Sequence, residues 1–264
     1  MAEFTANRIA AEIEKWAPLT YAEVYDNPGL LIGRGSKQVQ KILVAVDASE
    51  LVIAQAIAWN ADMLIVHHPL PFTPIKKITD EDRLGRQLLT LIENHIVLYA
   101  SHTNGDSAPG GGNDYACRLL NLEDVRAVAE ENQIPCLRIG KLKKACTLEE
   151  LADKVKEAYH LPKVRIFGNS KQKVGKVAVC IGSGMDFASL ASGQGADVLI
   201  TGDISDHRAD PAVANGLSLI DATHFLTDRL AMEQLAEKLR QLVAEKAAGI
   251  QIALAHEKEP FQTI

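Results

Sequence analysis

Histidine and aspartate residues recur in this sequence at spacings that could hold metal ions. The first group is His67-His68-Pro69, which follows the short apolar run Met63–Val66. Adjacent residues on a strand point to opposite faces, but the chain can turn where a strand ends and let both imidazoles converge. Imidazole is a common ligand of transition metals. The alternative is a pair of hydrogen-bonded histidines that only shape a loop.

A second group, His102 with Asp106, follows the apolar run Ile96–Ala100. In open α/β sheets, ligands bind beyond the carboxyl ends of the strands, which is where both groups are expected. The residues between His102 and Asp106 are small and polar, and they let the backbone turn. The alternative role for Asp106 is an Asx turn beside Gly105, which would leave it no part in binding a ligand.

The third group, His224 with Asp228, lies at the start of a long helix predicted from about Phe225 to Lys246. Residues four positions apart share a helical face, so the imidazole and the carboxylate would lie side by side. Helices often present metal ligands in this way. The alternative is that Asp228 is a first-turn aspartate stabilised by the helix dipole.

Two glycine-rich turns could bind an anion through backbone N–H groups. For Gly110-Gly111-Gly112 we favour a flexible turn in which Asn113 caps the following helix. For Gly182-Ser183-Gly184 we favour a tight turn from strand to helix, because the full dinucleotide and Walker patterns are absent. The sequence also contains no G-x-S-x-G elbow, which disfavours a serine hydrolase.

Together the three groups supply four imidazoles and two carboxylates at predicted strand ends. Such donors suit Zn, Fe, Mn, Co or Ni. Six candidates are too many for one tetrahedral zinc ion, but they suit two metals about 3.5–4 Å apart that activate a water. The candidate residues are His67, His68, His102, Asp106, His224 and Asp228.

The elements that must position these residues alternate between short apolar strands and helices, which predicts an α/β fold. The pattern also repeats: Ala61-Asp62-Met63-Leu64-Ile65 resembles Ala196-Asp197-Val198-Leu199-Ile200, and each copy is later followed by a histidine with an aspartate four residues on. We therefore expect two related α/β subdomains that face a central metal-binding cleft. The predicted division is 1–125 for the first half, 126–173 for a connecting segment and 174–264 for the second half.

Composition places the chain among ordinary globular proteins. It has 264 residues, 47% of them hydrophobic, and a net charge of −6. The mild acidity disfavours nucleic acid as a partner, and no stretch reaches the roughly 20 apolar residues of a membrane span. Charges interrupt the N-terminal apolar positions, unlike those of a signal peptide, and the four cysteines form no C-x-x-C pair. The expected location is cytoplasmic.

Beyond these inferences, the chain resembles the GTP cyclohydrolase 1 type 2 homologues, also called NGG-interacting-factor-three-like proteins, in their short form. The resemblance runs nearly end to end. The stretches that carry it are Trp16–Gly33, Val66–Leu70, Ser101–Asp106, Gly111–Asp114, Ala196–Ile204 and Asp221–Asp228.

The resemblance implies a dinuclear site of two divalent metal ions and a ring-shaped homohexamer. By motif match, the metal ligands would be His67, His68, Asp106, His224 and Asp228. His102 would stand beside the metals, either supporting a ligand or acting as an acid/base group. The last motif departs from the family, whose members usually read Gly-His-Tyr with Glu four residues after the histidine. Here the chain reads Thr223-His224-Phe225, and Asp228, shorter by one methylene, stands at the glutamate position.

The resemblance implies a metal-dependent hydrolase of the GTP cyclohydrolase 1 type 2 kind, with a nucleotide or another small molecule as the candidate substrate. The alternative is a non-catalytic metal-binding scaffold or regulatory interaction protein, which the altered last motif favours. The substrate and the identity of the metals are not encoded in any motif that we find.

Overall fold

The computed structural model describes residues 4–131, 133–246, 249–259 and 261. The chain divides into two compact units, here called unit 1 (residues 1–108 and 232–264) and unit 2 (residues 109–231). These bounds differ from the predicted division for a physical reason. The last helix and strand return to the first sheet, and the segment predicted as a connection supplies strands to the second sheet.

Unit 1 is built on a five-stranded sheet in the order β1-β4-β3-β2-β11. Strands β2, β3, β4 and β11 run parallel to their neighbours, whereas β1 is an antiparallel edge strand. The three central strands are buried almost throughout, as is typical of a parallel sheet covered on both faces. The strands are β1 (Gly29–Ile32), β2 (Lys41–Ala45), β3 (Met63–Val66), β4 (Val97–Ala100) and β11 (Gln251–Leu254).

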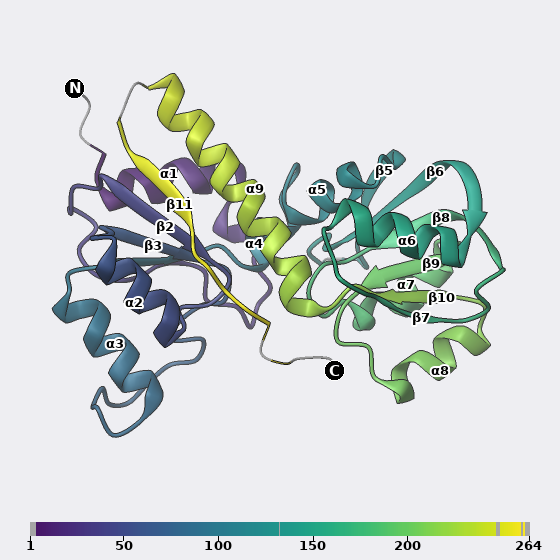
Figure 1. Ribbon diagram of the computed structural model, residues 1–264, viewed down its shortest axis with the longest axis horizontal. Helices are drawn as coiled ribbons and strands as arrows, with labels where there is room; N and C mark the ends of the chain where they lie inside the picture. The colour runs from purple at the N-terminus through teal and green to yellow at the C-terminus, as the bar shows by residue number, and fades with distance from the viewer. Residues whose placement is uncertain (1–3, 132, 247–248, 260, 262–264) are drawn as a thin grey trace. The chain divides into compact units, whose positions relative to one another are not determined.

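Helices cover both faces of the unit 1 sheet (Figure 1). Helices α2 (Glu50–Ala58) and α3 (Arg83–Glu93) pack their apolar side chains against one face. Helix α1 (Ala6–Trp16) lies on the other face together with the C-terminal part of α9 (His224–Glu245). Two short helical segments, η1 (Leu19–Tyr21) and α4 (Thr103–Ser107), complete the unit.

Unit 2 contains a six-stranded sheet in the order β5-β6-β8-β9-β10-β7. Strands β8, β9 and β10 are parallel, and the strands outside them pair antiparallel. The strands are β5 (Glu123–Val128), β6 (Leu137–Thr147), β7 (Arg165–Phe167), β8 (Lys173–Val179), β9 (Val198–Thr201) and β10 (Ser218–Asp221).

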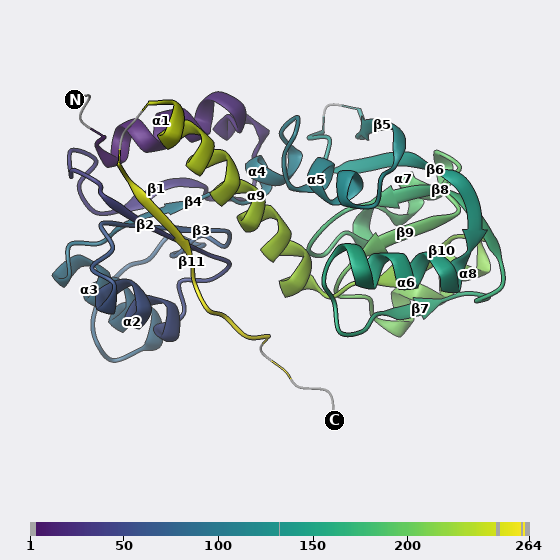
Figure 2. The same ribbon diagram turned by 45° about the horizontal axis from the view of Figure 1, so that its top comes forward.

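The unit 2 helices also lie on two faces of their sheet (Figure 2). Helices α7 (Ala188–Gly193) and α8 (Asp206–Ala214) bury Ala191 and Ala209 against one face. Helices α5 (Gly112–Leu119) and α6 (Leu148–Ala158) cover the other face, and the short η2 (Met185–Phe187) precedes α7. In the described part of the chain, no helix is long and apolar enough to cross a membrane.

Most predicted elements are present, and their caps explain where the helices begin. The side chain of Ser49 accepts a hydrogen bond from the Val52 N–H and caps the start of α2. Asn113, by contrast, is not the cap of α5: Gly111 holds that position, and the Asn113 side chain instead accepts from the Ile181 N–H at 2.8 Å. The sequence analysis also overlooked the edge strand β1 and the helix α4.

The internal repeat corresponds to a repeated strand arrangement. Asp62, just before β3, accepts hydrogen bonds from the Gln40 and Lys41 N–H groups at 2.9 and 3.1 Å. Asp197, just before β9, accepts from the Gly175 and Lys176 N–H groups, both at 2.8 Å. In each unit this aspartate therefore fixes the start of the neighbouring parallel strand, and the repeated sequence marks a repeated structural role.

Candidate metal centre

Three histidines of unit 1 gather at the carboxyl ends of two neighbouring parallel strands. His67 and His68 follow β3, and His102 follows β4 by two residues. Each of the three histidines has one ring nitrogen in this cluster, and these three nitrogens lie within 4.8 Å of one another. The parallel pairing of β3 with β4 brings their carboxyl ends to one edge, so the cluster is a direct consequence of the sheet topology.

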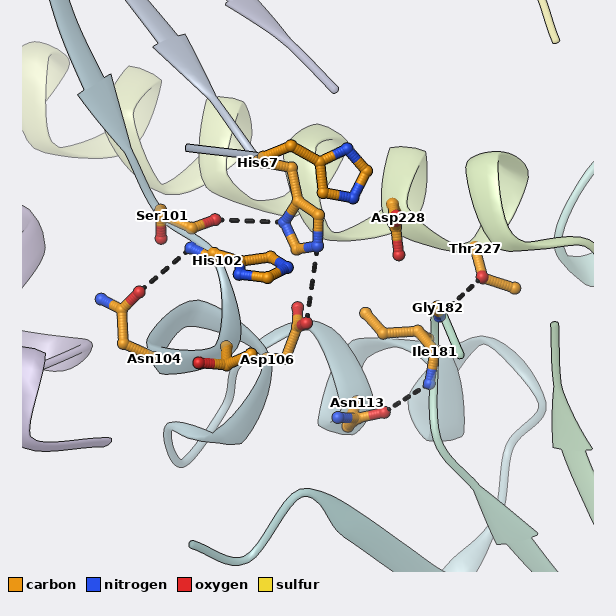
Figure 3. Close-up of polar contacts among 12 residues, drawn as sticks. His67, Ser101, His102, Asn104, Asp106, Asn113, Ile181, Gly182, Thr227 and Asp228 are labelled. Carbon is orange, nitrogen blue, oxygen red and sulfur yellow. Dashed lines mark hydrogen bonds and ion pairs between the residues drawn. The ribbon is translucent and has the colours of Figure 1, made fainter. Parts of the chain in front are cut away.

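His67 is held in one ring orientation by the backbone. Its Nδ1 lies 3.1 Å from the carbonyl oxygen of Ser101, which can only accept a hydrogen bond (Figure 3). The proton is therefore placed on Nδ1, and Nε2 carries the lone pair. That Nε2 lies 3.6 Å from Oδ2 of Asp106 in helix α4, beyond hydrogen-bond distance. Both atoms can thus serve as ligands of one cation.

Asp106 lies in helix α4, directly after the turn that follows β4. The local turn is made by Asn104, whose Oδ1 accepts from the His102 N–H at 3.0 Å (Figure 3). Asn104 also donates to the Ala17 carbonyl oxygen at 2.9 Å, which anchors helix α4. The Asp106 carboxylate is left facing the imidazole of His67.

His68 is oriented by a carboxylate that is itself held in place. Its Nδ1 lies 2.9 Å from Oδ1 of Asp47, the second residue after β2. Both side-chain oxygens of Glu257 accept hydrogen bonds here, one from the backbone N–H of Val46 at 2.7 Å and the other from that of Asp47 at 3.1 Å. Burial raises the pKa of Glu257 in spite of these two hydrogen bonds. Glu257 therefore fixes the backbone that carries the partner of His68.

His102 is coupled to a buried aspartate. Its Nδ1 lies 2.8 Å from Oδ1 of Asp26, whose side chain is fully buried. The other oxygen of Asp26 accepts from both the backbone N–H and the hydroxyl of Thr103. Burial alone would raise the pKa of Asp26, but the hydrogen bonds from His102, Thr103 and Asn27 outweigh it and hold that pKa below its usual range. Asp26 is therefore an ionised partner that orients His102.

In unit 2, His224 lies between two carboxylates. Its Nδ1 is 2.5 Å from Oδ2 of Asp203, and its Nε2 is 3.0 Å from Oδ2 of Asp228. The hydrogen bond with Asp228 is the largest influence and raises the pKa of His224 to about 9, against the opposing effect of burial; Asp203 adds to the rise. The pair of carboxylates therefore stabilises a positive charge at this position.

Asp228 is not a first-turn aspartate stabilised by the helix dipole. Helix α9 begins at His224, its first turn holds no acidic residue, and the Asp228 side chain is almost completely buried. Gly182 lies against this carboxylate with a φ of +68°, and a Cβ there would meet Oδ1 of Asp228 at 3.0 Å. The site thus requires glycine at position 182 both for its backbone conformation and for space.

The Gly182-Ser183-Gly184 turn is a tight turn, the interpretation that the sequence favoured. The Gly182 N–H donates to the hydroxyl of Thr227 at 2.9 Å (Figure 3), and the Gly184 N–H donates to that of Thr201 at 2.7 Å. These internal partners take two of the N–H groups that an anion could use. The Gly110 N–H likewise donates to Asp114 at 2.6 Å.

Three of the predicted ligands and His102 thus come together in unit 1, and His224 and Asp228 come together in unit 2. The central cleft stays a prediction. The sequence analysis missed the carboxylates that hold the imidazoles. Asp47 and Asp203 each lie two residues beyond a strand, which is the signal that could have found them. Asp26 lies in the segment before β1, within the stretch Trp16–Gly33 that carries the family resemblance.

The donor set fits a divalent transition metal. In all four histidines Nδ1 faces an oxygen: the carboxylates of Asp47, Asp26 and Asp203, and the carbonyl of Ser101. Such a hydrogen bond on one ring nitrogen orients a metal-binding imidazole and makes the other nitrogen a better ligand. Imidazole with carboxylate suits Zn, Fe, Mn, Co or Ni.

Comparison with known proteins gives consistent matches over the whole chain. The family model described as Duf34/NIF3 (NGG1p interacting factor 3) matches residues 4–260. A protein of Clostridium acetobutylicum called "GTP cyclohydrolase 1 type 2 homolog" is 36% identical over 231 residues, which is 86% of each chain. A protein of the same name from Clostridium perfringens is 34% identical and covers 98% of this chain and 99% of its own.

Solved structures show the same fold. A crystal structure of a hypothetical protein of Staphylococcus aureus superposes with a TM-score of 0.91 at 27% identity and covers all of both chains. A structure titled "Reduced HcgD from Methanocaldococcus jannaschii" has a TM-score of 0.82 at 29% identity and covers 96% of this chain and 98% of its own.

Proposed function

The chain belongs to the Duf34/NIF3 family, and on that premise we propose that it is a metal-dependent hydrolase. The metal ligands would be His67, His68 and Asp106 in unit 1 and His224 and Asp228 in unit 2. We propose two divalent ions per chain, because five ligand residues are more than one tetrahedral ion would need. The relatives' name suggests nucleotides as the first substrates to try.

One observation carries the metal proposal: every histidine at these strand ends has its Nδ1 engaged by an oxygen acceptor. Histidines that only shape a loop would need no common orientation. Here the four rings share one arrangement, in which Nδ1 faces an oxygen and Nε2 points away from that oxygen. The Nε2 atom lies near Asp106 in His67 and near Asp228 in His224. A bound divalent ion would supply Lewis acidity and make water a stronger nucleophile near neutral pH.

The residues of this chain that would move protons are His102 and Asp26. With Nδ1 of His102 protonated toward Asp26, its Nε2 is the basic atom that can take a proton from a reacting group. The imidazolium so formed would be stabilised by the ionised carboxylate of Asp26, 2.8 Å away. His102 would then return the proton from Nε2 to the leaving group, while Asp26 keeps the ring in place.

The second candidate function is a metal-binding protein without turnover. The shorter acidic side chain at position 228 favours it, because Asp228 is held against Gly182 and His224 rather than extended. A carboxylate in that position binds one cation beside His224 more readily than it bridges two.

An activity panel with metal analysis separates the two functions. Metal-loaded protein is assayed for hydrolysis of nucleoside triphosphates and other small electrophilic substrates, with and without chelator. We expect an activity that chelator removes and that His68→Ala abolishes, while the exposed-residue variant His207→Ala keeps it. A protein that retains its metal but hydrolyses nothing across the panel supports the scaffold function instead.

A further inference from the structure

Unit 2 contains a cavity that shares no lining residue with the His224–Asp228 pair. Its volume is about 290 Å³. It lies on strands β5, β6 and β8, and three of its six lining residues are cationic. The lining residues are Asp124, Arg126, Ile139, Gly140, Lys141 and Lys176.

The cavity is associated with an irregularity in the pairing of β5 with β6. Glu123 pairs with Lys141 and Arg126 pairs with Ile139, so β5 has one residue more than β6 between these pairs. Asp124, at this bulge, has a φ of +51°, a left-handed conformation in which aspartate is tolerated better than most residues. Bulges re-aim side chains at sheet edges and are common beside binding sites.

Strand pairing then places like charges next to one another. Lys141 on β6 lies directly opposite Lys176 on β8. Like charges directly opposite one another destabilise a sheet. Arg126 lies on β5, on the other side of β6, in register with Ile139. Three cations from three adjacent strands therefore face one cavity.

The partners of these cations leave a surplus of positive charge. Arg126 donates to the side-chain oxygen of Gln194 at 2.6 Å, and Lys176 donates to the backbone carbonyl of the same residue. Both acceptors are neutral. Only Lys141 has a carboxylate, with Asp124 at 3.0 Å. Among the lining residues, three cations against one carboxylate leave a surplus of two positive charges.

We propose that this cavity binds a small anion with a phosphate group. A phosphate monoester carries nearly two negative charges at neutral pH, which matches the surplus, and it offers three acceptor oxygens. The guanidinium of Arg126 can bind two of those oxygens at once, and the two ammonium groups are point-charge donors. The volume of about 290 Å³ lies just below the range of small-molecule pockets, about 300–1,000 Å³, so the ligand is a small molecule.

The test is a titration of metal-free, full-length protein followed by amide NMR. The probes are inorganic phosphate and, separately, glycerol phosphate, so that the free ion and a monoester are distinguished; sodium chloride at equal ionic strength controls for screening. We expect saturable shifts at Arg126, Gly140 and Lys176. In Arg126→Gln, the affinity should fall at least about tenfold, as expected for loss of a charge-assisted hydrogen bond.

Matched variants keep the result interpretable. Lys143→Gln removes an exposed lysine from β6 that does not line the cavity, and it should bind as the wild type does. Lys141→Gln tests a second lining cation in case Arg126→Gln disturbs the fold. The proposal is overturned if sodium chloride reproduces the shifts, or if both lining variants bind both probes with wild-type affinity. A stronger response to glycerol phosphate than to inorganic phosphate identifies a monoester as the ligand.

Discussion

The two units repeat one arrangement of three parallel strands but differ in the side chains at the strand ends. In unit 1 the residues after β3 are His67 and His68, whereas after β9 in unit 2 they are Gly202 and Asp203. A histidine follows the third strand in both, His102 after β4 and His224 after β10. The conserved part of the repeat is therefore the scaffold, and the donor atoms are specific to each unit.

The difference between the units suggests a division of roles. Unit 1 holds several imidazoles and a buried Asp26–His102 pair that suits proton transfer. Unit 2 holds one imidazole between two carboxylates, an arrangement that favours positive charge. On the proposed function, the strand-end residues of unit 1 would both bind a metal and move a proton, whereas His224 and Asp228 of unit 2 would bind a metal only.

The largest expected effect tests whether proton transfer belongs to unit 1. His102→Gln should lower kcat on the substrate found by the activity panel by about 10²–10⁴-fold, because a general acid/base is lost. Metal content should not change. His207→Gln, an exposed histidine on α8 of unit 2, is the matched control. A His102→Gln enzyme with wild-type kcat would assign proton transfer elsewhere.

The next largest effect tests whether a carboxylate in each unit orients a metal-binding histidine of that unit. Asp47→Asn in unit 1 and Asp203→Asn in unit 2 should each weaken metal affinity by about 10–100-fold, because the imidazole loses the carboxylate on its Nδ1. Affinity is measured by competition with a chelating dye. Glu257→Gln should have a smaller effect in the same direction, since Glu257 is hydrogen-bonded to the backbone of Val46 and Asp47 rather than to the His68 ring.

The exposed aspartate of α6, Asp153, provides the control for these variants, and Asp153→Asn should bind metal normally. If Asp47→Asn and Asp203→Asn also keep wild-type affinity, the orienting role of the carboxylates is refuted.

The shared scaffold can be tested through stability. Asp62→Ala and Asp197→Ala each remove a carboxylate that accepts two backbone N–H groups. Each should lower the free energy of unfolding by about 1.5–3 kcal/mol, the range for hydrogen bonds to a charged group. Urea denaturation measures the loss. A large loss in one variant with none in the other would show that the repeated aspartates are not equivalent.

The smallest effect concerns the attachment of α9 to unit 1. Hydrogen bonds from Lys15 and Lys246 lower the pKa of Glu12 to about 2. Because this folded-state pKa is below that of the unfolded chain, the stabilisation is present above pH 4.5 and is lost as the pH falls toward 2. Glu12→Gln should therefore cost less than about 1 kcal/mol at pH 7 and nothing near pH 2. An equal loss at both pH values would contradict the charge-based account.

Much of the fold could be predicted from local sequence. The runs Met63–Val66 and Val198–Thr201 are continuous and apolar, and both are buried parallel strands. Strands β5 and β6 were harder to predict, because β5 is exposed except at Val128 and β6 changes from a buried first part, Leu137–Gly140, to an exposed part with three lysines. Their pairing, with its bulge at Asp124, depends on neighbouring strands rather than on a local pattern.

The candidate site was predictable where residues follow a buried strand directly. His67, His68 and His102 were found in this way. Asp26 could not be found from spacing, because it reaches His102 across 76 positions of sequence. Glu257 reaches the backbone of Val46 across 211 positions. Such long-range contacts are set by how the strands and loops pack, and no short motif records them.

Metal retention after loading is the most direct test of the central claim, that these strand-end histidines bind metal. Wild type, His67→Ala and His224→Ala are loaded with Zn²⁺, dialysed and analysed for metal content, with circular dichroism to confirm that each is folded. We predict that the wild type retains zinc and that each variant, although folded, retains less. Full retention of zinc in both variants would contradict the account.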